Sequence, residues 1–434
     1  MSNNQINIVS KLRETPTFNP LPSWGEMEYS GWMDENVSWK KTCCLGDWSF
    51  GGNKGVLVEG PDALKLFQDL SVNSLKNLVG GKARHLVMCN EDGKCIINGI
   101  LFDRGDGSYY WQHHPEWPMY HMEKGGYNCT MTKTSFYGLQ LAGPTSIHVI
   151  EKLCGESIRD IPFMGFRNIT ICGHEVMCIR QNMAGEIGYE LEGPYEHHDE
   201  IVNALLEAGQ EFGIRRLGWR SVFMNHLESG TSQSDYIPAI YDESTKDYLD
   251  WLIAHKGKEY AYRFHISGSF ESDNIQDWYR SPYEQGWGMF VKFDHDFIGR
   301  KALEVESANK RRTWVSLEWN AEDIIDVYAS LMRPGPHYDY MDLPKNFLET
   351  IDTDTVFKDG KPVGVATSRG FSYYFRKTIS HCVIDVEYSA PGTEVEVLWG
   401  QPGHPQKLIR AVVHPSPYKQ DRRREDVTKL PCYL

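Results

Sequence analysis

From Gly55 onward, apolar residues alternate between short runs typical of β-strands and stripes typical of helices. GVLVEG, LVMCN, CIINGILFD and SYYWQH are such runs, and the turns NEDGK and RGDGS that join the last three carry the Asp-Gly pair of β-hairpins. Residues 60–70 instead show a helical stripe with Pro61 in the first turn. The apolar positions of that stripe are Ala63, Leu64, Phe67 and Leu70. The pattern predicts a mixed α/β region at the start of the chain.

A second strand-rich stretch runs from residue 128 to residue 181. An amphipathic helix is predicted over residues 195–213, where Gly213 is a suitable stop. Its apolar face would consist of Ile201, Leu205, Leu206 and Phe212. Residues 1–40 are polar and aromatic with little periodicity, and we expect them to wrap over a core.

After Arg300 the pattern becomes a series of strands at the spacing of a sandwich or barrel. The segments are TWVSLEW, TVFKDGKPVGVATS, TISHCVIDVEY, TEVEVLWG and LIRAVVH, and KDGK at residues 358–361 is a hairpin turn. A boundary in the polar SANKRR stretch divides the chain into residues 1–307 and 308–434. A long insert at about 320–350, rich in Asp, Tyr and Pro, interrupts the second part.

Composition restricts the range of partners. The 434 residues include 45 basic and 59 acidic side chains, and the net charge of -14 argues against nucleic acid or an anionic membrane as a general partner. The densest basic run, DRRRE at residues 421–425, is expected to be a solvated tail. No apolar stretch has the length of a signal peptide or membrane span, so the expected location is the cytoplasm, where the ten cysteines would be reduced.

Several motifs, taken in order, resemble the aminomethyltransferase family of the glycine cleavage T-protein. They are GPDALKLFQDL, AGEIGYELEGP, LGWRSVFMNHLESG, SPYEQGWGMFVKFDHDFIGRKAL, GKPVGVATSRGFSYYFRKTIS and PGTEVEVLWG. The resemblance implies an α+β fold in which three domains form a ring. Two interleaved α/β domains bind folate, and the third domain is a C-terminal β-barrel.

Within this family, four further segments look like the tetrahydrofolate-dependent aromatic O-demethylases that act on vanillate and syringate. These are MYHMEKGGYN, IPAIYDE, GSFESDNIQDWYRSPYE and WNAEDIIDVYASL. The resemblance implies tetrahydrofolate as cofactor and a small aromatic methyl ether as substrate. The expected reaction transfers the methyl group to tetrahydrofolate and gives a phenol and 5-methyltetrahydrofolate.

Such a reaction needs an acid for the departing phenolate oxygen, because an aryl methyl ether is a poor electrophile. A tyrosine, with an ordinary pKa of about 10, is close to the pKa of the leaving phenol. Tyr241, in IPAIYDE, matches the tyrosine that the resembling demethylases use there, and it is the expected catalytic residue.

The resemblance also assigns the folate-binding residues. Glu190 matches the carboxylate that grips the pterin, whose aminopyrimidine edge presents two N–H donors. The other expected cofactor contacts are Tyr189, Asn98, Arg220, Tyr283 and Trp287. Strand alternation places Tyr189 opposite Glu190, so pattern alone does not decide which of them faces a ligand.

Two departures from the family concern the substrate. Asn98 stands where T-proteins carry an aspartate, which argues against glycine-cleavage chemistry. The segment YYWQHHPEW lacks the arginine with which vanillate-type enzymes hold a benzoate carboxylate. The expected substrate-binding residues are Trp48, Phe50, Trp111 and His113. They favour an uncharged methoxyarene or a methylenedioxy ring, since a carboxylate buried without a cation is costly.

Other functions remain open on the sequence. They are methylene transfer from a methylenedioxyphenyl compound, demethylation of a sulfonium or an amine, and a non-enzymatic folate-binding scaffold, although the KGCYxGQE-type run of that last branch is missing. No metal site is expected, because the pair at His113 and the HHDE run at residues 197–200 do not supply three converging ligands.

Overall fold

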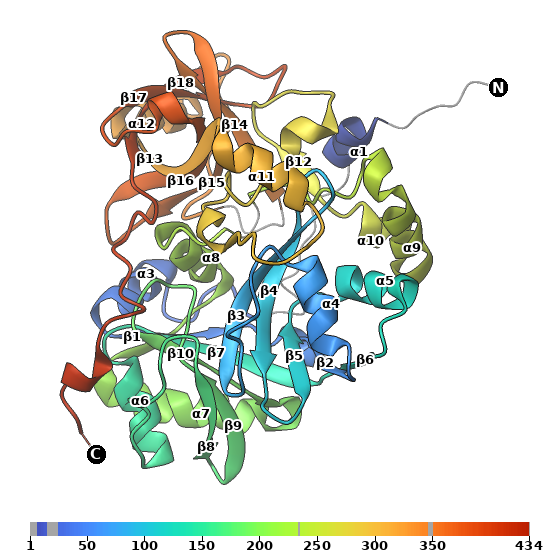
Figure 1. Ribbon diagram of the computed structural model, residues 1–434. Coiled ribbons are helices and arrows are strands. Elements are labelled where there is room, and N and C mark those ends of the chain that lie inside the picture. The colour runs from blue at the N-terminus through green and yellow to red at the C-terminus, as the bar shows by residue number, and fades with distance from the viewer. Residues whose placement is uncertain (1–6, 15–24, 233–234, 346–349, 434) are drawn as a thin grey trace.

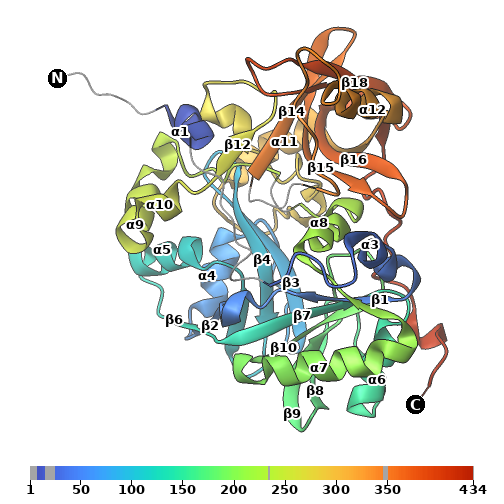
Figure 2. The ribbon, with the colours of Figure 1, turned by 180° about the vertical axis from the view of Figure 1, so that it is seen from behind.

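The computed structural model describes residues 7–14, 25–232, 235–345 and 350–433. Figure 1 shows two sheets in the lower half of the molecule and a barrel above them, and Figure 2 shows the same arrangement from behind. The chain places β1 in one sheet, builds the other sheet from β2 to β6, and returns to the first sheet with β7 to β11. The two N-terminal units are therefore interleaved in sequence, in the way the family resemblance implies.

The five-stranded sheet has the order β3-β4-β5-β2-β6, with all neighbours antiparallel. Its strands are β2 (Val56–Glu59), β3 (Lys82–Cys89), β4 (Cys95–Asp103), β5 (Ser108–Gln112) and β6 (Thr130–Lys133). The helices α4 (Ala63–Leu70), α5 (Glu116–Gly125), α9 (Lys246–Lys256) and α10 (Lys258–Ala261) contribute apolar residues to one core with this sheet. The stripe of α4 lies in that core, as its sequence periodicity predicts.

The six-stranded sheet has the order β11-β1-β7-β10-β9-β8. Its strands are β1 (Cys43–Asp47), β7 (Phe136–Ala142), β8 (Phe166–Ile171), β9 (His174–Ile179), β10 (Gly188–Pro194) and β11 (Ile214–Arg216). The helices α6 (Ser146–Cys154) and α7 (His198–Gly209) share a core with one face. The helices α3 (Trp32–Lys41) and α8 (Trp219–Glu228) share another core with the opposite face. Cys43 and Cys44 accordingly belong to different cores, as strand alternation requires.

The C-terminal barrel closes through six strands in the order β14-β15-β16-β13-β18-β17, because β17 also pairs with β14. The strands are β13 (Arg312–Trp319), β14 (Thr350–Lys358), β15 (Lys361–Ser372), β16 (Lys377–Asp385), β17 (Glu394–Trp399) and β18 (Lys407–His414). A short strand, β12 (His265–Ser267), adds to β14 in parallel. The helix α11 (Arg300–Ala308) precedes the barrel, and α12 (Ala321–Ser330) packs its apolar side on the barrel core.

The remaining described elements are short. The N-terminal helix is α1 (Ile8–Glu14), and the 3-10 turns are η1 (Phe50–Gly52), η2 (Tyr195–His197), η3 (Gln210–Phe212), η4 (Glu243–Thr245), η5 (Ile275–Trp278), η6 (Gly288–Phe290), η7 (Val386–Tyr388) and η8 (Val427–Lys429). No helix in the described ranges has the length and apolarity needed to cross a membrane.

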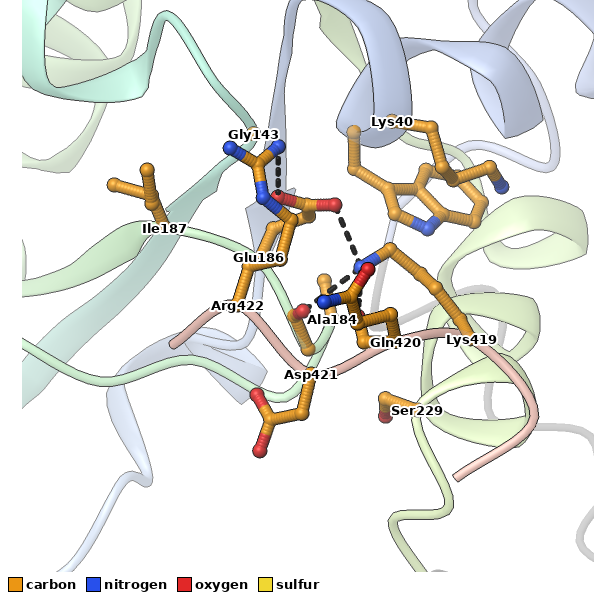
Figure 3. A network of polar contacts seen from close by, with 12 residues as sticks. Lys40, Gly143, Ala184, Glu186, Ile187, Ser229, Lys419, Gln420, Asp421 and Arg422 are labelled. Atoms are coloured by element: carbon orange, nitrogen blue, oxygen red, sulfur yellow. Dashed lines mark hydrogen bonds and ion pairs between the residues drawn. The ribbon is translucent and has the colours of Figure 1, made fainter. Parts of the chain in front are cut away.

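The C-terminal segment returns from the barrel and fastens the loop before β10. Figure 3 shows Lys419 between Glu186 and the main chain, with Arg422 on the other carboxylate oxygen. The Lys419 Nζ atom lies 2.6 Å from Glu186 Oε1 and 2.8 Å from the carbonyl oxygen of Gly185. Because Glu186 is 2% exposed, this ion pair is a buried one and holds the start of β10 in place.

The structure has several helices in segments that the sequence pattern left without a helix. The N-terminal forty residues include α1 and α3, and α6 lies inside the stretch interpreted as strands. The region 320–350 contains α12, while residues 346–349 of that region lie outside the described residues. The predicted helix at 195–213 is confirmed as η2, α7 and η3, with Gly213 in the left-handed conformation after it.

Candidate functional site

A cavity of about 1710 Å³ lies where the two sheets, the barrel and the segment 236–240 meet. Single-ligand pockets usually measure about 300–1,000 Å³, so this cavity has room for more than one small molecule. Its walls include residues of β4, β5, β10, α8, α9 and the barrel strands β13, β15 and β16. The site therefore uses every major part of the fold.

The cavity brings together six of the residues that the sequence singled out and leaves out five. The residues that line it are Trp48, Phe50, Asn98, His113, Glu190 and Trp287. The residues that do not are Trp111, Tyr189, Arg220, Tyr241 and Tyr283. Each of the five has a local contact or a place in the core that explains its position.

Glu190 lies in the middle of β10 with its carboxylate in the cavity wall and only 3% of its surface exposed. Gln181 Nε2 donates to its Oε1 at 2.5 Å, and Gln112 Nε2 donates to its Oε2 at 3.4 Å. Burial raises the pKa of Glu190, while the nearby charge of Lys54 lowers it. A carboxylate has about four acceptor positions, so two remain for a ligand with paired N–H donors.

Glu192 lies two residues further along β10 and points to the same side. It accepts a hydrogen bond from Gln112, so this amide joins the two carboxylates. Burial, with a further contribution from the charge of Glu190, raises the pKa of Glu192 to about 7. Since Glu192 does not line the cavity, we interpret it as support for Gln112 and Glu190.

This buried acid makes the stability of the protein depend on pH. Between the unfolded pKa of about 4.3 and the folded pKa of about 7, the folded chain holds a proton that the unfolded chain releases, so stability falls as the pH rises through that window. Glu192→Gln mimics the protonated acid and removes the dependence. We expect the variant to melt with the wild type at pH 5 and roughly 2–4 °C above it at pH 8 in a calorimeter. Equal melting temperatures at pH 8 would contradict this, and the exposed Glu175→Gln is the matched control.

Tyr189, an expected cofactor contact, does not line the cavity. Tyr189 is fully buried in the core between the six-stranded sheet and the helices α6 and α7. The alternation of β10 sends Glu190 to the cavity and its neighbours Tyr189 and Leu191 to that core.

Trp111 is likewise a core residue and does not form a pocket wall. It is fully buried beside Phe67, and its indole N–H donates to the carbonyl oxygen of His114 at 3.1 Å. Gly99 on β4 makes room for it, because a Cβ atom there would lie 2.7 Å from the Trp111 ring. The neighbouring His113 does line the cavity, and burial holds its pKa well below the usual value.

Asn98 stands between two cavity residues that the sequence did not single out. The His85 Nε2 atom lies 2.8 Å from Asn98 Oδ1, and the Asn98 amide donates to the hydroxyl of Tyr236 at 3.5 Å. Burial lowers the pKa of His85, so the ring is neutral and its N–H donates to Asn98. Because the Tyr236 hydroxyl accepts the hydrogen bond from Asn98, its own O–H remains free to donate into the cavity.

An aromatic wall surrounds this group. Trp287 lies edge-to-face with His85 at 5.6 Å and with Tyr236 at 6.2 Å between ring centroids. Phe290 also lies edge-to-face with His85, at 5.2 Å between ring centroids. Both residues line the cavity, Trp287 just before the turn η6 and Phe290 at its end, and they offer flat apolar surface beside the His85 and Tyr236 partners of Asn98.

Tyr241, the expected catalytic residue, does not line the cavity. Its hydroxyl donates to the carbonyl oxygen of Ala261 at 2.8 Å, and its ring stacks on Tyr262. Burial raises the pKa of Tyr241, and only 7% of its surface is exposed. The residue before it, Ile240, lines the cavity, so the segment passes the site with the Tyr241 side chain turned into the core.

We therefore expect Tyr241→Phe to behave as a structural substitution. Removing one buried hydrogen bond should lower the free energy of unfolding by about 1 kcal/mol. Turnover should stay within about twofold of wild type, measured once the substrate is identified. A hundredfold loss of turnover with unchanged cofactor affinity would restore Tyr241 as the acid.

Arg220 and Tyr283 also lie outside the cavity wall. Arg220 forms an ion pair with Glu28 and donates to the carbonyl oxygen of Leu343. It thus fastens the N-terminal segment and the barrel insert. Tyr283 packs in a core with Trp287, and the ammonium group of Lys310 lies 4.8 Å above its ring.

Trp48 and Phe50 line the cavity and also belong to the core around α8. Their rings lie edge-to-face at 6.0 Å, and Trp48 contacts His226 at 4.9 Å. Burial lowers the pKa of His226 to about 3, so this end of the cavity is uncharged and aromatic.

The basic run DRRRE is not a solvated tail throughout. Arg423 and Arg424 line the cavity, as do Arg84 and Lys292. Arg423 donates twice to Asp421, and the guanidinium of Arg424 lies 4.4 Å from the ring of Phe163.

The sequence analysis did not identify several cavity residues, because only the fold brings them together. Gln112, Gln181, Tyr236 and His85 belong to separate segments and have no spacing in common. Residues 113–119 and 248–264 contribute a further group of lining residues, of which the sequence assigned only His113 to the site. We call the part of the cavity that they line the donor chamber. Its lining residues are His113, His114, Pro115, Glu116, Met119, Tyr248, Trp251, Leu252, His255, Lys256, Tyr260, Arg263 and Phe264.

One group of side chains in the described part of the chain has the spacing of metal ligands. The ligand atoms of His174, His197 and Glu200 lie within 4.8 Å of one another, and none of the three lines the cavity. His197 and Glu200 belong to the HHDE run, whose convergence with His174 the sequence did not indicate. The expectation that the protein has no metal site stays a prediction.

Comparison with known proteins agrees with this architecture. Residues 22–236 match the GCVT N-terminal domain, and residues 349–418 match the glycine cleavage T-protein C-terminal barrel domain. The solved structure of glycine cleavage system aminomethyltransferase T from Bartonella henselae superposes with a TM-score of 0.67 over 95% of this chain and 96% of that one, at 18% identity. This likeness establishes the fold.

Two curated relatives are more similar in sequence. Syringate O-demethylase from Sphingobium sp. (strain NBRC 103272 / SYK-6) is 32% identical over 96% of this chain and 94% of the relative. Sesamin methylene transferase from Sinomonas sp. (strain No.22) is 33% identical over 90% of each chain. With these matches and the ring of two sheets and a barrel, the chain belongs to the glycine cleavage T-protein family of folate-dependent one-carbon transferases.

Proposed function

We propose that this protein is a tetrahydrofolate-dependent O-demethylase that removes a methyl group from a methoxylated aromatic compound. The products are the corresponding phenol and 5-methyltetrahydrofolate. The observation that carries the proposal is the placement of Glu190, an aromatic wall and the hydroxyl of Tyr236 around one cavity that has room for a cofactor and a second small molecule.

The cavity residues fit a reduced pterin. Glu190 keeps two acceptor positions after its bonds to Gln181 and Gln112, which suits the paired N–H donors of an aminopyrimidine edge. Trp287 and Phe290 offer apolar ring surface in the wall of the same cavity. When bound, tetrahydrofolate supplies the nitrogen that accepts the methyl group.

Tyr236 takes the role of acid in this proposal, in place of Tyr241. Its hydroxyl accepts from Asn98 and therefore directs its own proton away from that amide. Burial raises the pKa of Tyr236, so the phenol is protonated at neutral pH and available to the departing oxygen. As the C–O bond breaks, its electron pair stays on that oxygen, which takes the proton and leaves as a phenol.

The second small molecule would bind in the donor chamber. Tyr248, Trp251 and Phe264 give this chamber aromatic walls of the kind that hold flat rings. Tyr236, Pro238 and Ile240, from the segment 236–240, line the same cavity as the chamber residues and Asn98. This segment would thus contribute to the wall around the ligands and, with Tyr236, supply the acid.

Sequence similarity to characterised enzymes supports the proposal independently of the cavity. One relative at 32% identity is a syringate O-demethylase, and another at 33% is a sesamin methylene transferase. The nearly equal identities make methylene transfer from a methylenedioxyphenyl compound the second candidate function.

The decisive assay is an anaerobic incubation of the protein with tetrahydrofolate and a panel of donors. The panel should contain guaiacol, 3-methoxybenzoate, a methylenedioxybenzene and dimethylsulfoniopropionate, with chromatographic separation of the folates. The proposal predicts 5-methyltetrahydrofolate and an equal amount of phenol from a methoxyarene. Methylene-tetrahydrofolate from the methylenedioxybenzene alone would establish the second candidate, and product from the sulfonium alone would overturn both.

A further inference from the structure

Three side chains of the kinds that bind transition metals meet at the start of β9, outside the cavity. His174 is the first residue of β9, His197 ends the turn η2, and Glu200 lies in the first turn of α7. One ligand atom from each residue lies within 4.8 Å of those of the other two. The fold brings the three together, because α7 lies beside β8 and β9 in both ribbon views (Figures 1 and 2).

A hydrogen bond and a ring contact hold the three side chains in place. The His174 Nε2 atom lies 2.9 Å from Glu200 Oε2, and the rings of His174 and His197 stack with centroids 3.7 Å apart. The carboxylate of Glu196 lies 3.5 Å from His197 Nε2, which exceeds the usual length of an N–H···O hydrogen bond. The His–Glu hydrogen bond therefore accounts for His174 and Glu200, and the convergence of a His197 nitrogen on the same point needs a further reason.

The spacing of these atoms suits a small metal ion. Zinc binds histidine nitrogens and carboxylate oxygens at about 2.0–2.2 Å, so the ligand atoms of a tetrahedral site lie about 3.4 Å apart. The separations here run from 2.9 Å to at most 4.8 Å, so small side-chain rotations bring them to that value. Each histidine side chain is 27% exposed and that of Glu200 is 57% exposed, which leaves an approach for the ion and for a water ligand.

We propose that His174, His197 and Glu200 bind a zinc ion that fastens the β8–β9 hairpin to the start of α7. Two imidazoles and a carboxylate are a donor set of zinc, with a fourth position for water. The proposal departs from the expectation of no metal site. That expectation considered the HHDE run by itself, whereas His174 comes from a different strand. It is independent of the proposed function, since none of the three residues lines the cavity.

The ion would act on the stability of this part of the fold. The hairpin and α7 already share a core, to which Ile171 and Val176 contribute from one side and Ile201 and Val202 from the other. A metal bound at the outer end of this contact adds a link that the unfolded chain lacks. Binding to the folded state alone raises its stability by mass action.

Zinc titration of the full-length protein, freed of metal with a chelator, tests the proposal. We expect calorimetry to show one zinc ion per chain with a Kd of about 10 μM or tighter. At a hundredfold excess of zinc over that Kd, the melting temperature should rise by about 3 °C or more. Magnesium at the same concentration should leave the melting temperature unchanged, because this hard cation prefers oxygen ligands to imidazole.

Two variants separate metal binding from the local contacts. His197→Phe keeps an aromatic ring to stack on His174 but removes the ligand nitrogens, and Glu200→Gln keeps a hydrogen bond to His174 but removes the charge. Each should bind zinc at least tenfold more weakly than the wild type and melt within about 1 °C of it without metal. His404→Ala is the matched control, since His404 pairs with Asp339 at 2.8 Å outside this group, and it should keep full zinc affinity.

Cobalt(II) adds a readout of the ligand geometry. The wild type should give the intense visible absorption of a four-coordinate cobalt ion, and His197→Phe should lose it. A wild type that binds no zinc, or a folded His197→Phe that binds it as the wild type does, would overturn the proposal. Loss of binding in Cys172→Ser with binding retained in His197→Phe would place the ion on the exposed thiol of the hairpin turn and would overturn it as well.

Discussion

Glu190→Gln should lower the affinity for tetrahydrofolate by about hundredfold or more. Each hydrogen bond to a charged acceptor contributes about 1.5–3 kcal/mol, and the variant would remove the charge from both bonds to the aminopyrimidine edge. The glutamine amide can accept only one of them, and its own NH2 group would face a donor of the ligand. Titration of the protein with tetrahydrofolate under anaerobic conditions measures the dissociation constant directly.

The control for this experiment is Glu175→Gln, which neutralises an exposed carboxylate on β9 of the same sheet. It should bind tetrahydrofolate like the wild type. The melting temperature of Glu190→Gln shows whether the variant is folded, and the substitution should not destabilise it, because burial already penalises the charged form of Glu190. An affinity within threefold of wild type in a folded variant would remove Glu190 from the cofactor site.

Tyr236→Phe should lower turnover by about 10²- to 10⁴-fold and leave the affinity for tetrahydrofolate unchanged. This range is what a positioned general acid contributes. The aromatic contact with Trp287 survives in phenylalanine, so the wall that faces the cofactor is preserved. Steady-state rates of phenol release measure the effect.

Donors with different leaving groups distinguish an acid role of Tyr236 from a structural role. A donor such as 4-nitroanisole releases a more stable phenoxide, which needs the acid less, so the loss in Tyr236→Phe should be much smaller with it than with guaiacol. Tyr241→Phe is the matched control and should show the same small effect on both. An equal loss with both donors in Tyr236→Phe would assign Tyr236 a structural role.

The sequence predicted the fold well because the family motifs and the hydrophobic periodicity agree with each other. The hairpins of the five-stranded sheet follow the Asp-Gly turns, and the barrel strands follow the alternating runs after residue 312. The helices α3 and α6 were missed because their apolar faces serve cores whose other walls lie far away in sequence.

Six of the eleven expected site residues line the cavity, and a motif alone does not decide which side chains face it. In β10 the motif gives Glu190, but the side on which Tyr189 lies depends on which face of the sheet meets the cavity. Sequence alone could not indicate that Tyr236 lines the cavity and Tyr241 does not, because both residues lie in one short segment without regular structure. Their separation comes from Asn98 on β4 and Ala261 at the end of α10, which bind the two hydroxyls.

The wall of the donor chamber illustrates the same limit. Arg263, two residues after α10, lines the cavity with His113 and Glu116, although about 150 residues separate them in sequence. The contact between α5 and α9 brings the two walls of the donor chamber together, as Figures 1 and 2 both show. The spacing of residues along the chain does not indicate that these two helices pack together.

A crystal structure of the protein with tetrahydrofolate bound would test the central claim most directly. The account predicts the aminopyrimidine edge within hydrogen-bonding distance of the Glu190 carboxylate, the pterin beside Trp287, and the methyl-accepting nitrogen facing Tyr236 and the donor chamber. A pterin bound elsewhere, with the Glu190 carboxylate bonded only to Gln112 and Gln181, would contradict it.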